Sequence, residues 1–212
     1  MNFKHFIFPL ATTLFSACNN TETITAQDSD GLKIEYARDK KTGTKEGAFV
    51  KYFLTGIKNE EATYHSNVLD GVRTIYDFNG KKDVTETYKN GIYEGEFQAF
   101  YPSGALKQKG MYTNNAMVGV WISYYENGTL KEEVTIANNE ENGPFKEYYT
   151  NGKIAAEGGY ANGKEQGELK EYNEQGELTR KANCESGTCI TAWRSDYIID
   201  KTKPLNNQMV KE

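Results

Sequence analysis

A 24-residue spacing of glycines organises most of this 212-residue chain. The first glycine of each unit defines position 1, and a second glycine follows nine residues later at position 10. The position 1 series is Gly47, Gly71, Gly95, Gly119, Gly143 and Gly167, and the position 10 series is Gly56, Gly80, Gly104, Gly128, Gly152 and Gly176. A fixed period of this length is typical of a protein built from stacked copies of one small unit.

Aromatic residues occupy fixed places in each unit. Position 6 is always aromatic: Tyr52, Tyr76, Phe100, Tyr124, Tyr148 and Tyr172. Position 3 carries Phe49, Arg73, Phe97, Trp121, Phe145 and Leu169, so Arg73 is its one polar member. Position 18 carries Tyr64, Tyr88, Tyr112, Ile136, Tyr160 and Cys184. These rows are the expected core, and each unit must bury them against its neighbours.

Each unit predicts one β-hairpin. Apolar residues alternate in short runs, as in a half-buried strand, and they do not recur at helical spacing. Asn-Gly pairs such as Asn127-Gly128 and Asn162-Gly163 separate the runs and tolerate the positive φ of tight turns. The predicted fold is therefore all-β, an elongated and twisted antiparallel sheet of tandem 24-residue hairpins.

The motif from Gly119 to Leu130, GVWISYYENGTL, resembles MORN repeats (membrane occupation and recognition nexus). More closely, it is similar to the bacterial variant often described as the YwqK-like antitoxin family. The resemblance covers residues 31–199. It implies a sheet of MORN-type hairpins, and its antitoxin label implies a role in masking a toxin.

The repeat pattern also sets the expected boundaries. Residues 31–46 read as the second half of a repeat, 47–190 as six full repeats and 191–199 as a terminal strand. Residues 200–212 form a polar tail, in which Lys201, Lys203 and Pro204 would discourage further strand pairing.

The N-terminus reads as an export signal. Residues 1–17 contain Lys4 and a short apolar run that ends in small residues, which favours a signal peptide over a membrane-spanning helix. The segment 14–18, LFSAC, resembles a bacterial lipobox, although Phe15 replaces the usual leucine. This resemblance implies cleavage before Cys18 and lipidation of Cys18, which would anchor the chain to a membrane. The alternative is an ordinary secreted protein with an unmodified Cys18.

Residues 18–30 are polar and acidic, and they predict a flexible tether between the lipid and the repeats. Fully extended, such a tether would span about 40 Å. Asn19 is not the aspartate associated with retention in the inner membrane. The resemblance therefore implies a location in the cell envelope, at the outer membrane of a Gram-negative bacterium.

The remaining cysteines, Cys184 and Cys189, flank a short turn of the last repeat. An exported compartment permits a disulfide between them, and the short loop predicts a small stabilisation. A metal or redox site is the alternative, but further ligands are lacking, because His65 is distant in sequence. The expectation is therefore no metal and no cofactor.

Composition narrows the possible partners. The net charge of -5 argues against nucleic acid and against simple adhesion to anionic lipid headgroups. His65 is the single histidine after the signal peptide, and neither HExxH nor CxxC occurs. We therefore expect a protein that is not an enzyme.

A row of aromatic residues at position 7 is the candidate partner-binding site: Phe53, Tyr101, Tyr125 and Tyr149. Positions 6 and 7 point to opposite faces of a strand, so one of the two aromatic series could lie exposed. Exposed tyrosines suit contact with a protein, a peptide or a glycan. The alternative is that both series pack within the sheet.

Repeat two departs from the pattern at Arg73 and Asp77, and His65 lies just before it. Such departures can mark a site, or they can be drift near a terminal repeat. The expected function is a non-enzymatic, envelope-anchored repeat scaffold for protein–protein or glycan contact. An antitoxin that masks a toxin partner and a protein that recognises membrane lipid are the alternatives.

Overall fold

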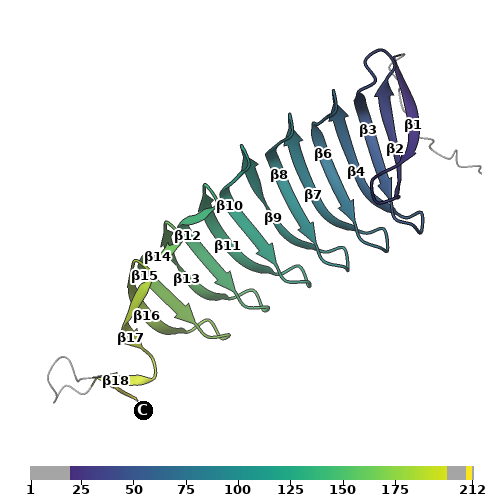
Figure 1. Cartoon of the computed structure of the whole chain (residues 1–212). Coiled ribbons are helices and arrows are strands. Elements are labelled where there is room, and N and C mark those ends of the chain that lie inside the picture. Colours follow the sequence, from purple (N-terminus) through teal and green to yellow (C-terminus); the bar gives the residue numbers. More distant parts are fainter. Residues whose placement is uncertain (1–19, 200–208, 212) are drawn as a thin grey trace, which may run out of the picture.

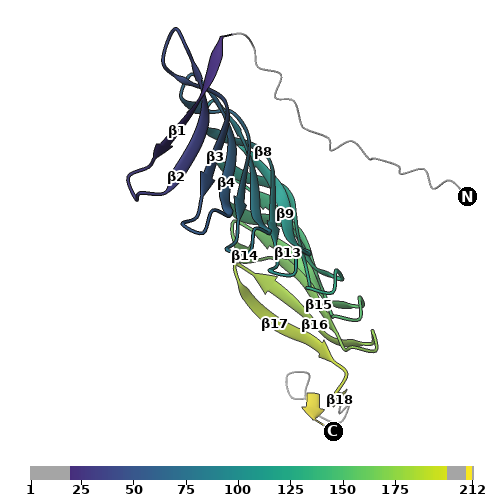
Figure 2. The same cartoon turned by 90° about the vertical axis from the view of Figure 1, so that its right-hand side faces the viewer.

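A computed structural model describes residues 20–199 and 209–211. Most of the chain forms one long antiparallel sheet whose strands follow one another in chain order (Figure 1). The sheet is a single, strongly twisted layer (Figure 2). No helix in the described ranges is long and apolar enough to cross a membrane. The prediction of an all-β, elongated sheet of tandem hairpins is confirmed.

The sheet consists of seven hairpins followed by one single strand. The hairpins are β1 (Thr21–Gln27) with β2 (Lys33–Asp39), β3 (Lys45–Tyr52) with β4 (Lys58–His65), β6 (Gly71–Tyr76) with β7 (Lys82–Lys89), β8 (Ile92–Phe100) with β9 (Leu106–Thr113), β10 (Ala116–Tyr124) with β11 (Leu130–Ala137), β12 (Glu140–Tyr148) with β13 (Ile154–Ala161), and β15 (Gly167–Tyr172) with β16 (Leu178–Glu185). The short strands β5 (Val68–Leu69) and β14 (Lys164–Glu165) precede β6 and β15, and β17 (Thr188–Arg194) ends the sheet.

Two kinds of turn alternate along the sheet. Within a hairpin, the backbone N–H of Tyr125 donates to the carbonyl of Thr129 at 2.8 Å, and Gly128 supplies the positive φ. Between hairpins, Asn138 and Asn139 both adopt left-handed φ values, which a tight turn between antiparallel strands requires. The glycine and asparagine periodicity of the sequence therefore corresponds to the turns.

The turns between hairpins also join neighbouring repeats. The N–H of Asn115 donates to the carbonyl of Tyr93 at 3.0 Å, and the Asn115 side chain accepts from the N–H of Tyr93 at 2.9 Å. Asn139 makes the same two bonds with Met117, at 3.2 and 2.8 Å. These bonds fix the spacing of successive hairpins along the side of the sheet where the turns between hairpins lie.

The core lies on one face, which we call the aromatic face. Position 3 of each first strand pairs with position 16 of the returning strand, as in Trp121 with Val134 and Phe145 with Gly158. Trp121 is 2% exposed and contacts the rings of Phe97 and Tyr112, with centroids 5.4 and 5.3 Å away. Because a single layer has no second sheet to pack against, each ring is buried largely by rings of adjacent repeats.

The predicted tether is wrong over Thr21–Gln27. These residues form β1, which pairs with β2 over its whole length, from Thr21 opposite Asp39 to Gln27 opposite Lys33. Glu22 also binds Arg38 at 2.5 Å. The segment is polar because it is an edge strand, and Ile24 and Ala26 still alternate with polar residues. The expected half repeat at 31–46 is thus the second part of a complete hairpin.

The C-terminal boundary also differs from the prediction. The expected terminal strand at 191–199 leaves the main sheet after Arg194, at the contact between the Arg194 guanidinium and the Asp196 carboxylate (2.8 Å). Tyr197–Ile199 form β18, which pairs with β19 (Met209–Lys211) in a separate two-stranded sheet. The polar tail therefore does pair with another strand. The predicted signal peptide, residues 1–17, and Cys18 lie outside the described residues.

Candidate partner-binding surface

The position 7 tyrosines brace one repeat against the next. The hydroxyls of Tyr101, Tyr125 and Tyr149 donate to the backbone carbonyls at position 6 of the following repeat, at 2.7, 2.7 and 2.6 Å. All three side chains are half-buried. Their hydroxyls are therefore already engaged, and only part of each ring remains accessible to a partner. The proposal that this row binds a partner stays a prediction.

Phe53, the fourth member of that row, packs differently. Its ring lies 4.3 Å from the ring of Phe78, centroid to centroid. Phe78 is 75% exposed, and Leu54 beside Phe53 is 87% exposed. The turn tips of the first two repeats thus carry a small apolar cluster, whereas the corresponding tips of later repeats carry Pro102, Glu126, Thr150 and Glu174.

The position 6 tyrosines lie on the face opposite the aromatic face, which we call the outer face. Four of the five reach back to a glutamate of the preceding hairpin: Tyr52 to Glu35 at 2.7 Å, Tyr148 to Glu133 at 2.8 Å, Tyr172 to Glu157 at 2.9 Å, and Tyr76 to Glu61. The Glu35 hydrogen bond and burial raise the pKa of Tyr52 to about 12. These tyrosines therefore serve as links between repeats.

Arg73 takes the place of an aromatic ring on the aromatic face. Its guanidinium contacts Glu60 at 2.8 Å and Glu86 at 3.1 Å. Tyr93 and Tyr88 complete the shell of Glu86 by donating their hydroxyls to its two oxygens, at 2.8 and 3.1 Å. Burial works against the charged form of Arg73, but Glu60 and Glu86 outweigh it and raise the pKa of Arg73. The departure of repeat two is thus a satisfied polar cluster within the core.

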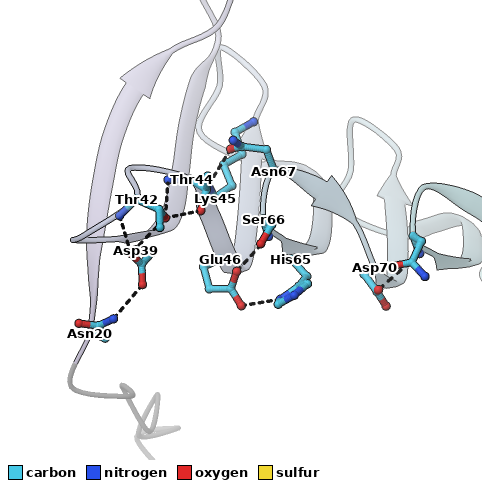
Figure 3. Close-up of polar contacts among 11 residues, drawn as sticks. Asn20, Asp39, Thr42, Thr44, Lys45, Glu46, His65, Ser66, Asn67 and Asp70 are labelled. Carbon is cyan, nitrogen blue, oxygen red and sulfur yellow. Dashed lines mark hydrogen bonds and ion pairs between the residues drawn. The ribbon is translucent and has the colours of Figure 1, made fainter.

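The other two residues that the sequence singled out in this region, His65 and Asp77, make contacts within turns. His65 Nδ1 lies 2.8 Å from Glu46 Oε1, and the N–H of Ser66 donates to Glu46 Oε2 at 2.9 Å (Figure 3). Asp77 accepts the backbone N–H groups of Asn79 and Lys81 at 2.9 Å each. Both residues therefore organise local backbone, and the structure does not bring them together with Arg73 in one site.

Cys184 and Cys189 are opposite each other on β16 and β17 and are joined by a disulfide. Glu165 Oε2 lies 3.0 Å from the Cys189 sulfur. Carboxylate and sulfur atoms at this spacing could in principle hold a metal ion. Since the two sulfurs are bonded to each other, neither is a thiolate, which is the form that binds metal.

The outer face carries a group of exposed apolar side chains that the sequence reading did not identify. They are Val68, Val72, Ile92, Met111 and Val120, and they are 42%, 54%, 37%, 43% and 54% exposed. Strand pairing places them on the same face: Val72 is opposite Thr87, Ile92 opposite Lys89, and Val120 opposite Thr135. Met111 pairs with Val118, which extends the group. We call these five residues the apolar strip.

The apolar strip is confined to part of the array. Its members stand at positions 2, 17 and 22 between residues 68 and 120. The equivalent positions further along the chain carry Thr135, Glu140, Pro144, Gly159, Lys164, Glu168, Asn183 and Thr188, and Glu96 takes position 2 within the strip itself. The same hairpin therefore folds with polar residues, proline or glycine at these places, so the apolar side chains are not required by the repeat. A comparison of the six repeats at positions 2, 17 and 22 would have revealed the strip from the sequence.

The geometry defines a class of protein, a single-layer array of β-hairpin repeats. Four of these repeats, residues 69–90, 93–114, 117–138 and 141–162, match the MORN repeat variant family. Each matched segment covers one first strand, the turn and the returning strand. The hairpins on either side of residues 69–162 continue the same geometry beyond the matched segments.

Other comparisons add little. No curated protein matches the chain. Two crystal structures, one of an S. aureus TarM mutant and one of TarM, are similar to it, with 15% and 16% sequence identity and a TM-score of 0.28 each. They cover 57% and 56% of this chain, and this chain spans about a fifth, 21% and 20%, of TarM. A likeness of this size carries no argument about fold or activity.

Proposed function

We propose that the protein is a non-enzymatic repeat scaffold that binds a partner protein through the apolar strip. The observation that carries this proposal is the confinement of Val68, Val72, Ile92, Met111 and Val120 to one face of neighbouring repeats. Exposed apolar groups of this kind are characteristic of protein contact sites. The hydrogen bonds between repeats support it further, because they fix the spacing of the contact residues.

The surroundings of the strip indicate the chemistry of the partner. Polar side chains lie among the apolar ones on the outer face: Thr87 is opposite Val72, Thr135 opposite Val120, and the exposed Glu96 opposite Met111. Hydroxyls beside half-exposed valines suit a partner with an apolar centre and a polar rim, as in ordinary protein interfaces. A glycan would instead favour exposed aromatic rings, which the strip does not contain.

The proposed anchor places this scaffold close to a membrane. If Cys18 carries lipid, β1 begins only three residues later, at Thr21. Three extended residues span about 10 Å. Asn20 is already tied to the sheet, because its carbonyl accepts from the N–H of Lys40 at 2.9 Å. Its side-chain amide also donates to Asp39 at 2.9 Å (Figure 3). The scaffold would therefore project directly from the membrane surface at the cell envelope.

In-cell crosslinking, followed by purification of the tagged full-length protein and mass spectrometry, tests the proposal. The strip variant combines Val72→Ser and Val120→Ser, and the matched control is Glu168→Ser at the same repeat position. A protein recovered with wild type and the control but lost from the strip variant would support the proposal. Recovery with the strip variant, combined with loss when Tyr101, Tyr125 and Tyr149 are changed to serine, would move the site to the position 7 row.

Glycan binding, an antitoxin role and lipid recognition each predict a different result for the same purified protein. Recovery of glycan fragments without a protein would replace protein binding by glycan binding. An antitoxin role requires that the recovered protein inhibits growth when expressed alone and that this chain relieves the inhibition. Lipid recognition requires that the Cys18→Ser variant still binds protein-free vesicles.

A further inference from the structure

Three side chains with metal-binding atoms meet near the C-terminal end of the sheet (Figure 1): Glu165 of β14, Cys184 of β16 and Cys189 of β17. Glu165 Oε2 lies 3.0 Å from the Cys189 sulfur, and the three ligand atoms all lie within 4.8 Å of one another. Cys184 is buried, and Cys189 and Glu165 are half-buried. Both cysteines pack with the apolar core, so the cluster borders that core.

The cluster occupies places that are filled by packing residues earlier in the array. Cys184 stands at position 18, and Glu165 and Cys189 stand at position 23 of successive repeats. In repeats two and three the same positions carry Tyr88, Tyr93, Tyr112 and Met117, and the rings of Tyr88 and Tyr93 lie 4.3 Å apart. The hairpin therefore does not need carboxylate or sulfur at these places in order to fold.

Backbone contacts hold Glu165 against the hairpin that carries both cysteines. The N–H of Gly187 donates to the backbone carbonyl of Glu165 at 3.0 Å, and the N–H of Ser186 donates to Gln166 Oε1 at 3.1 Å. Cys184 and Cys189 are opposite each other on β16 and β17. The strands thus position all three side chains independently of the disulfide, which is the preorganisation that a metal site requires.

The Glu165 carboxylate lacks a partner that would satisfy it. Within the described residues, its one close polar neighbour is the Cys189 sulfur, and no lysine, arginine or histidine pairs with it. A disulfide sulfur has no proton to donate, whereas a thiol has one. An ionised carboxylate beside sulfur is therefore better satisfied when the sulfurs are reduced, or when a cation lies between the carboxylate and the sulfurs.

We propose that, once the disulfide is reduced, Cys184, Cys189 and Glu165 bind one zinc ion or a similar thiophilic divalent cation. A dithiol reductant opens the disulfide by thiol–disulfide exchange and is itself oxidised to a disulfide, so the protein gains two thiols. The cation then displaces both thiol protons, and the two thiolates and the carboxylate bind it. A water molecule completes the tetrahedral site.

The spacing of the three side chains fits such an ion. Zinc binds sulfur at about 2.3 Å and carboxylate oxygen at about 2.1 Å, so ligand atoms of a tetrahedral site lie about 3.6 to 3.8 Å apart. Opening of the S–S bond lets the two sulfurs separate to this distance, and Glu165 Oε2 needs to withdraw from Cys189 by only about 0.6 Å. The site is independent of the apolar strip, because the two lie on different repeats.

Metal titration of the full-length protein in detergent, purified on a tag without histidine, tests the proposal. The protein is reduced with a dithiol, freed from it by gel filtration without oxygen, and titrated with cobalt or cadmium ion. We expect the reduced protein to bind one ion per chain with thiolate–metal charge-transfer absorbance, and the oxidised protein to show none. Cys18→Ser should bind as wild type does. Reduced protein without this absorbance overturns the proposal.

Variants of the carboxylate test the third ligand. Glu165→Gln keeps the size of the side chain and loses its negative charge, so we expect the dissociation constant for zinc, measured by competition with a chelator, to rise about tenfold or more. Glu141→Gln, at the same position one repeat earlier, is the matched control and should bind zinc as wild type does. Unchanged affinity in Glu165→Gln overturns the three-ligand site, and so does an equal loss in Glu141→Gln.

Discussion

Arg73 holds two carboxylates on the strands that flank it: its Nε donates to Glu60 at 2.8 Å, and its Nη1 to Glu86 at 3.1 Å. The Glu86 side chain is only 10% exposed and that of Glu60 is 15% exposed. In five of the six repeats the same place is filled by a ring or by leucine. The ion cluster is therefore a local substitute for aromatic packing, and it depends on all of its members.

We predict that Arg73→Phe destabilises the protein even though phenylalanine is the commonest residue at this position. The substitution leaves Glu60 and Glu86 without their cation, and removing one partner of a buried ion pair costs about 3 kcal/mol. Urea denaturation followed by circular dichroism would measure the loss. A variant as stable as wild type would contradict the structural role of this cluster.

The stability lost in Arg73→Phe should return when Glu60 and Glu86 are replaced as well. Glu86→Gly reproduces Gly110, which pairs with Phe97 in repeat three, and Glu60→Val reproduces Val84, which takes the same repeat position as Glu60 one repeat later. The triple variant Arg73→Phe, Glu60→Val, Glu86→Gly should regain the stability of wild type to within about 1 kcal/mol, because a packed apolar group can replace an ion cluster. Continued instability would show that repeat two differs from repeat three in more than this cluster.

The sheet could be predicted from the sequence because its constraints are local. A positive φ is required at turns such as Asn138-Asn139 and Gly128, and few residues other than glycine and asparagine adopt it readily. One repeated pattern of turns and alternating residues therefore determines both the hairpin and its stacking. The spacing of 24 residues predicts the register from one repeat to the next without knowledge of the contacts.

Three features could not be predicted from the sequence pattern: β1, the glutamates around Arg73 and the apolar strip. β1 was overlooked because an edge strand needs an apolar residue on one face only, and Ile24 and Ala26 are too few to form a pattern. Glu60 and Glu86 are distant from Arg73 in sequence and become its neighbours only through the pairing of β4, β6 and β7. The apolar strip does not follow from the repeat pattern, because its members stand at positions whose residues vary from one repeat to the next.

Gly110 is the second place where we predict a large effect from a small substitution. A Cβ added there would lie 2.2 Å from the Trp121 ring, which covers this glycine. Gly110→Ala should therefore cost about 3 kcal/mol through overpacking. Thermal or urea unfolding would measure it, and a cost well below 1 kcal/mol would show that Trp121 moves aside freely.

A second substitution should relieve this clash. Trp121→Phe shortens the ring, and it breaks no hydrogen bond because the buried Trp121 Nε1 makes none with the protein. Val134 and Phe145, which are opposite each other on β11 and β12, are the equivalent natural pair, and they show that phenylalanine tolerates a side chain at the position of Gly110. In a double-mutant cycle, Gly110→Ala should therefore cost less in the Trp121→Phe background, with a coupling of about 1 kcal/mol or more. Strict additivity would contradict a direct clash.

The tyrosine–glutamate links predict a loss of stability at high pH. Contact with Glu35 raises the pKa of Tyr52, and burial with Glu61 and Glu133 raises those of Tyr76 and Tyr148, each from 10.0 to about 12. A raised folded pKa means that the unfolded chain loses the proton first. The stabilisation is therefore complete below pH 10 and is lost as the pH rises through about 12.

Urea unfolding at a series of pH values, with tyrosinate absorbance as a second probe, would measure this dependence. The Tyr52 link also weakens in acid, because hydrogen bonds from Lys33 and Tyr52 hold the pKa of Glu35 below its ordinary value. Replacement of Tyr52, Tyr76 and Tyr148 by phenylalanine, which repeat three already carries at Phe100, should flatten the alkaline fall. An unchanged alkaline fall in that variant would locate the sensitive groups elsewhere.

The position 7 tyrosines allow packing to be separated from binding. Tyr125 donates its hydroxyl to the Tyr148 carbonyl at 2.7 Å, so Tyr125→Phe removes one hydrogen bond between repeats and keeps the ring. We expect a loss of about 1 kcal/mol for this variant and for Tyr101→Phe and Tyr149→Phe, because each leaves a carbonyl without its donor. The serine variants remove the ring as well and should cost clearly more.

Unfolding curves and partner recovery, measured on the same proteins, complete this test. If the row serves only to brace the repeats, the phenylalanine variants lose stability and keep the partner that the apolar strip binds. If the rings themselves form the contact, the phenylalanine variants keep the partner, but it is lost from serine variants that are still folded. Loss of the partner from folded phenylalanine variants would assign the contact to the hydroxyls, and it would show that the bonds between repeats open when the partner binds.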